Sequence, residues 1–114
     1  MKKIFILIFT FSINLIYSKE IQVNLLELYK ELHANPELSY QEYETSKKLA
    51  SLLESIGYQV TRNVGGNGVV ALLENGDGNT VMFRADMDGL PVEEKTGASY
   101  ASKNRVKNLE GEEV

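Results

Sequence analysis

Two carboxylates, Asp86 and Asp88, directly follow an apolar run and are the residues best placed to carry chemistry. Carboxylates two positions apart can bind a hard divalent cation, or act as a base and its partner. The run at residues 81–85 predicts a strand, and in α/β folds catalytic groups gather where strands end. The alternative is a structural loop whose aspartates cap nearby amides.

Three further motifs favour structural roles. His33 is the only histidine and is placed near a helix end, where it can interact with the helix dipole. Because the chain has no cysteine, one histidine cannot build a nitrogen- and sulfur-ligated zinc site. The glycine-rich residues 65–68 lack the Lys-Ser/Thr pair and the following helix of a phosphate loop, which indicates a turn. The acidic pair Glu93 and Glu94 is interpreted as a solvated surface.

Two helices are predicted ahead of the acidic residues. Apolar side chains spaced three and four apart indicate a helix over residues 22–34, which ends before Pro36. A second helix is predicted over residues 40–56. Ser39 followed by Glu42 matches a capping box at its start, and Gly57 suits the left-handed position after its end.

Strands are predicted to follow the helices, giving an α/β fold class: two helices and then a mixed sheet with a hairpin. Residues 58–62 indicate a short strand. Residues 69–73 and 81–85 predict the hairpin, because the segment between them is rich in Asn, Asp and Gly. Both runs are apolar on both faces, which predicts a sheet covered on both sides, with the helices on one of them. Residues 103–114 contain little that could pack.

The N-terminus predicts export. Lys2 and Lys3 precede an apolar stretch that ends at Ser18, the pattern of a secretory signal peptide over residues 1–18. We therefore expect residues 19–114 to be periplasmic or secreted, with no membrane partner after cleavage. The formal net charge is −4, and it becomes −6 without the two lysines of the leader. An acidic chain argues against nucleic acid as a partner, because phosphate binding needs a basic face.

Three ordered blocks then resemble one known family. Residues 32–42, 68–71 and 83–94 are similar to successive blocks of the metal-dependent amidohydrolases of the aminoacylase/carboxypeptidase clan of zinc peptidases. The branch that they resemble contains hippurate hydrolases, N-acyl-amino-acid amidohydrolases and plant auxin-conjugate hydrolases. The resemblance covers residues 22–102, and three blocks in order are more specific than any single motif.

The resemblance implies a zinc-peptidase-like catalytic domain, of which residues 19–114 would be the N-terminal portion, and a smaller inserted dimerisation domain. It implies a homodimeric enzyme that hydrolyses small N-acyl amino acids with two divalent metals (Zn, Mn, Co or Ni) and a glutamate base. On this resemblance Asp88 supports a metal ligand from behind. Asp86 occupies the position where related branches place a metal-binding histidine. Gly89 stands where the family more often has alanine, a small departure that leaves the resemblance intact.

The resemblance also implies that the metal ligands lie in a later histidine- and cysteine-containing block, so we expect no metal to be completely ligated here. The chain alone is therefore expected to be inactive. Two alternatives remain: a non-catalytic exported binding module, and a haloacid-dehalogenase-like phosphatase in which Asp86 attacks phosphorus beside magnesium. The reading frame downstream would distinguish them.

Overall fold

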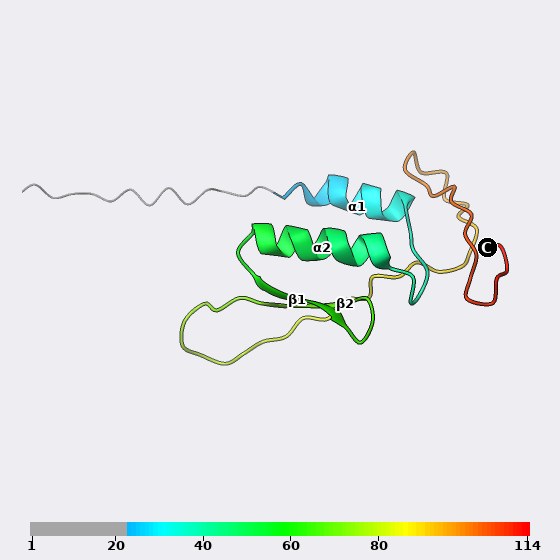
Figure 1. The fold of residues 1–114 in the computed structure, drawn as a ribbon. Helices are drawn as coiled ribbons and strands as arrows, with labels where there is room; N and C mark the ends of the chain where they lie inside the picture. The colour runs from blue at the N-terminus through cyan, green and yellow to red at the C-terminus, as the bar shows by residue number, and fades with distance from the viewer. Residues whose placement is uncertain (1–22) are drawn as a thin grey trace, which may run out of the picture.

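The computed structural model describes residues 23–114 and contains two helices followed by a β-hairpin. The elements in chain order are α1 (Leu25–Ala34), α2 (Tyr43–Ser55), β1 (Gln59–Val64) and β2 (Gly68–Leu72). In Figure 1, α2 lies between α1 and the hairpin. The predicted α/β class, with two helices followed by a sheet that contains a hairpin, is confirmed. The predicted signal peptide lies outside the described residues.

The first helix starts later than the apolar pattern indicates. Asn24 caps it, because its side-chain oxygen accepts the backbone N–H of Glu27 at 3.2 Å. The helix ends before Asn35, as the proline after it requires. An ion pair between Glu31 and Lys48 joins α1 to α2.

The predicted capping box at the start of α2 is wrong. The helix begins at Tyr43, and Glu42 at the N-cap makes no side-chain bond to the helix. The Glu42 carboxylate instead accepts the N–H of Tyr40 at 3.0 Å, and the Ser39 hydroxyl donates to Asp88. Both members of the expected box therefore form hydrogen bonds outside the helix. The backbone N–H groups in the first turn of α2 are bound by another side chain.

Glu37 provides that side chain. Its two carboxylate oxygens accept the backbone N–H groups of Glu44 at 3.1 Å and Thr45 at 2.7 Å. Burial opposes ionisation of Glu37, but hydrogen bonds from Thr45 and Glu44 hold its pKa below the usual value. A carboxylate six residues ahead of the helix thus satisfies donors that a local cap would normally take.

The end of α2 is as predicted. Gly57 has φ +96°, and its N–H donates to the carbonyl of Glu54 at 3.1 Å. The N–H of Tyr58 reaches back to the carbonyl of Leu53 at 3.0 Å. This pair of bonds is a Schellman motif, and it explains why glycine is needed at this position.

The hairpin forms between different strands from those predicted. β1 pairs antiparallel with β2, with Gln59 opposite Leu72, and the glycine-rich residues 65–67 make the turn. Residues 81–85 form no strand within the described chain. The turn at 65–67 brings neighbouring strands together over fewer residues than the predicted connection at 74–79, so it costs less closure entropy. Within residues 23–114 two isolated bridges add to this pair: a parallel one between Leu38 and Gly89 and an antiparallel one between Lys107 and Glu113.

The hairpin is covered on one face only by the described residues. α2 packs against both strands, and its Ala50 is the fully buried apolar residue of this part of the chain. Val70 and Leu72 of β2 remain about half exposed. Of the two helices predicted to cover one face, α2 does so, and no described residue covers the other face.

The segment after β2 leaves the sheet. In Figure 1 it extends beyond the hairpin as an open loop, and Phe83 within it is 94% exposed. The last residues return on themselves: Val106 and Val114 exchange backbone hydrogen bonds of 3.1 and 2.9 Å. Backbone bonds thus order a segment that offers little to pack. Within residues 23–114, neither helix is long and apolar enough to cross a membrane.

Candidate functional site

The two predicted site residues lie at the start of a loop that we call the acidic loop, residues 86–94. Asp86 is 66% exposed and pairs with Arg84, its Oδ1 lying 2.6 Å from Nη2. Asp88 Oδ2 accepts the hydroxyl of Ser39, which comes from the connection between α1 and α2. The two carboxylates therefore bind different partners.

Asp86 and Asp88 line the same cavity, which fits an extended segment because alternate residues share a face. It measures about 570 Å³ and lies between α1, α2 and the acidic loop. Leu32 of α1 and Leu49 of α2 supply apolar walls. The structure thus brings both predicted residues to one concave surface; their catalytic role remains a prediction.

Glu94 is the residue that sequence reasoning missed. It is not a solvated surface acid: its side chain is only 14% exposed. Its Oε1 lies 2.9 Å from His33 Nε2 and accepts the hydroxyl of Thr96, and its Oε2 accepts the N–H of Ser102 at 2.7 Å. Hydrogen bonds from Thr96, His33 and Ser102 lower the pKa of Glu94 to about 2. The carboxylate is therefore ionised at any ordinary pH.

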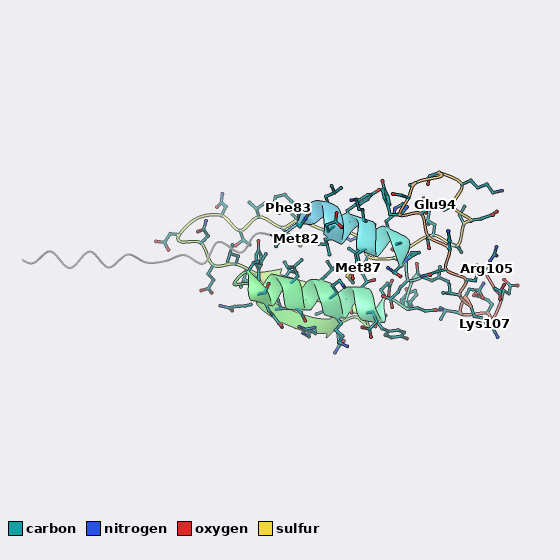
Figure 2. All side chains as sticks on the ribbon, turned by 90° about the horizontal axis from the view of Figure 1, so that it is seen from above. Met82, Phe83, Met87, Glu94, Arg105 and Lys107 are labelled. Carbon is teal, nitrogen blue, oxygen red and sulfur yellow. The ribbon has the colours of Figure 1, made fainter. Side chains whose placement is uncertain are left out.

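His33 lies near a helix end, as predicted, but its partner was not foreseen. It lies in the last turn of α1, and its ring faces Tyr29 and Tyr100 at centroid distances of 5.5 and 5.3 Å. The carboxylate of Glu94 comes from 61 residues away. Both residues fall within the blocks that resemble the family, but sequence spacing carries no information about a contact over that separation. Figure 2 shows Glu94 beside the C-terminal end of α1.

The position of Gly89 has no room for a larger side chain. Its N–H donates to the carbonyl of Glu37 at 2.7 Å, which holds the acidic loop against the connection between the helices. A Cβ added at Gly89 would lie 2.6 Å from Cβ of Pro36. Alanine at this position would therefore require the loop to move away from the proline ring, whereas glycine fits without strain.

A metal centre would need more donors than this part of the chain supplies. Among residues 23–114 no three His, Cys, Asp or Glu side chains gather closely enough to hold a metal ion. Asp86 and Asp88 are engaged by Arg84 and Ser39. The described donor set therefore does not by itself fit a two-metal centre.

Comparisons with known proteins identify relatives of this chain. It is 45% identical over 87 residues to thermostable carboxypeptidase 2 of Saccharolobus solfataricus, covering 75% of this chain and 22% of that protein. It is 38% identical over 85 residues to a hippurate hydrolase of Campylobacter jejuni, covering 74% and 22%. It is 38% identical over 82 residues to an IAA-amino acid hydrolase of Arabidopsis thaliana, covering 72% and 18%.

The similarity is confined to part of each relative, since the chain spans about a fifth of the length of the curated relatives it matches. No protein-family profile matches the chain. No solved structure matches it either. The identities nevertheless extend over about three quarters of the chain and reach proteins from an archaeon, a bacterium and a plant. The chain therefore belongs to the hydrolase family that includes these carboxypeptidase, hippurate hydrolase and IAA-amino acid hydrolase relatives.

Proposed function

We propose that the chain is part of an exported, metal-dependent amidohydrolase that cleaves the amide bond between an acyl group and an amino acid. The observation that carries this proposal is the 38–45% identity to three named hydrolases. Two of those names specify hippurate and IAA-amino acids, which are both amides formed on an amino acid nitrogen. No phosphatase is among these relatives, so the alternative in which Asp86 attacks phosphorus has no support from them.

The activity belongs to a longer protein, to which this chain contributes one wall of a cavity. When bound, two divalent ions (Zn, Mn, Co or Ni) would polarise the amide carbonyl and acidify water. Residues 23–114 do not supply enough ligands to bind those ions without the rest of the longer protein. Asp88 uses Oδ2 to accept from Ser39, which leaves Oδ1 to orient a metal ligand from elsewhere in the protein. Asp86 adds negative charge to the same cavity. The longer protein is proposed to be a homodimer.

A chimera tests this proposal. Residues 23–114 would replace the matching segment of the Saccharolobus carboxypeptidase, and hydrolysis of N-acyl amino acids would be measured with added zinc or cobalt. We expect the chimera to be active, and Asp88→Asn to lower metal affinity or rate about 10- to 100-fold. The matched control is Asp77→Asn, an exposed aspartate in the open loop after β2, which should change neither.

Two results would contradict the proposal. A folded chimera that binds metal but hydrolyses no N-acyl amino acid would remove the substrate assignment. Equal activity of the Asp88→Asn and Asp77→Asn chimeras would remove the role of Asp88. The 114-residue chain alone should be inactive on the same substrates, and metal-dependent turnover by it would overturn that expectation.

Export has its own test, because it rests only on the sequence of residues 1–18. Fusion of residues 1–22 to a reporter that is active only outside the cytoplasm should give signal, and N-terminal sequencing of the product should start near Lys19. Replacing Lys2 and Lys3 by glutamate should reduce export. A reporter that stays cytoplasmic would refute the leader assignment.

A further inference from the structure

The acidic loop is attached at both of its ends to the short stretch of residues 33–39. Near its start, Asp88 accepts the Ser39 hydroxyl and the N–H of Gly89 donates to the carbonyl of Glu37. At its end, Glu94 binds His33. These two attachment points therefore define the position of the loop over the cavity.

The attachment at Glu94 is the better enclosed of the two. Three donors converge on its carboxylate, from His33, Thr96 and the N–H of Ser102. An ionised carboxylate has no hydrogen to donate, so the Nε2 atom of His33 must carry the hydrogen in this bond. Hydrogen bonds to a charged acceptor are about twice as strong as neutral ones. The bond is therefore directional as well as charge-assisted.

The histidine ring is itself held in place. Tyr29 lies one turn earlier on α1, and the rings of Tyr29, His33 and Tyr100 are mutual neighbours at centroid distances of 5.3 to 5.7 Å. Such packing restricts rotation of the imidazole and aims Nε2 at Glu94. The local pair of Lys30 and Glu27, in contrast, lies within α1 and can position nothing outside that helix.

We propose that His33 and Glu94 are a positioning pair, which fixes the end of the acidic loop on α1 and so orients Asp86 and Asp88 toward the cavity. Neither residue is assigned a contact with substrate. The catalytic part of this inference rests on the proposed function above, whereas the mechanical part can be measured on the 114-residue chain itself. The pair acts through the loop, so its loss should disturb residues that it does not touch.

The first experiment uses NMR on the 114-residue chain with His33→Gln and Glu94→Gln. Both variants should accelerate exchange of the Gly89 amide by about tenfold or more, the size expected for loss of one charge-assisted bond. The side-chain carboxyl resonances of Asp86 and Asp88 should move as well. In the unchanged protein the nitrogen shift of His33 Nε2 should be that of a protonated ring nitrogen.

Two further variants separate positioning from general destabilisation. Lys48→Gln removes a different side-chain link of α1, its pair with Glu31, without touching the loop, and should leave Gly89 exchange unchanged. The exchanged pair, His33→Glu with Glu94→His, should restore slow exchange only in part, because a histidine at position 94 cannot accept all three donors that converge on Glu94. Unchanged Gly89 exchange in both glutamine variants would overturn the proposal, as would an equal effect of Lys48→Gln.

The second experiment puts the same variants into the carboxypeptidase chimera. A positioning role predicts that kcat falls about tenfold or more while KM stays within about twofold, because only the alignment of the cavity wall changes. An unchanged kcat in an active chimera would overturn the catalytic part of the inference. An inactive unmodified chimera would count against the proposed function alone, and the exchange measurements would then decide the positioning pair.

Discussion

Replacing Gly89 by alanine is the sharpest test of how the acidic loop is seated. The new methyl carbon would lie 2.6 Å from Cβ of Pro36, whereas carbon atoms in contact lie about 3.5–4.0 Å apart. The loop must therefore move by about 1 Å, because a proline ring cannot swing aside as a long side chain can. That movement stretches the 2.7 Å bond from the Gly89 N–H to Glu37 beyond hydrogen-bonding distance.

The expected cost follows from these two effects, which overlap because opening the loop relieves the clash. Overpacking costs about 1–3 kcal/mol, and a lost neutral hydrogen bond about 0.5–1.5 kcal/mol. We expect a total of about 1–3 kcal/mol for local opening. Since about 1.4 kcal/mol is a factor of ten, the protection of the residue-89 amide should fall by about five- to 150-fold.

Amide hydrogen exchange followed by NMR measures this directly. The control is Gly97→Ala, where φ is +71° but no atom lies within 4 Å of the added carbon. It should leave residue 89 unaffected. Pro36→Gly, combined with Gly89→Ala in a double-mutant cycle, should recover part of the loss. Unchanged protection in Gly89→Ala alone would refute the reasoning, because it would mean that the loop does not press on Pro36.

Three further outcomes are expected. Glu37→Ala should destabilise α2 by about 0.5–2 kcal/mol, read as lost helicity by circular dichroism, and Ser39→Ala should not, because the cap is Glu37. The pKa of Glu94 is lowered from 4.5 to about 2, so its contribution to stability is complete above pH 4.5 and is lost as the pH falls through about 2. An NMR titration of the Glu94 carboxyl carbon should give that midpoint, and Glu94→Gln should flatten the stability profile between pH 4.5 and 2. Gly68→Ala should break the pairing of β1 with β2, since its Cβ would lie 2.2 Å from the carbonyl oxygen of Val64, and cross-strand NOEs should disappear.

The local signals of the sequence were reliable where one residue type satisfies a local need. Gly57 ends α2 because few other residues accept φ +96°, and the glycines at 65 and 66 turn the hairpin for the same reason. The helices were placed to within three residues by their apolar spacing. Each of these features depends on atoms within one or two turns of the chain, which is why the sequence displays them.

The features that failed depend on distant residues. Ser39 had the right type and spacing for a capping box, but Asp88, 49 residues later, takes its hydroxyl. Glu94 looked like a surface acid because nothing near it in sequence shows that His33 lies within hydrogen-bonding distance. The predicted pairing of β2 with residues 81–85 was also wrong. β2 pairs with β1 instead, because the glycine turn that joins β1 to β2 is shorter than the connection at residues 74–79. Which strands pair and which side chains form hydrogen bonds depends on competition between segments far apart in the sequence. Residue spacing alone does not show which of the competing contacts is more stable.

The exposed residues after β2 have a consequence for the behaviour of the protein in solution. Val81, Met82 and Phe83 form an apolar tripeptide in water, and Figure 2 shows Met82 and Phe83 well separated from Glu94 and Arg105. An apolar extended segment beside a small sheet with free edges favours self-association, and it does so more strongly as concentration rises. Stability and exchange measurements on this chain should therefore be repeated over a dilution series, so that unfolding is separated from aggregation. Met82, with its thioether in solvent, also offers a simple indicator: its rate of oxidation by peroxide should fall wherever another surface covers this segment.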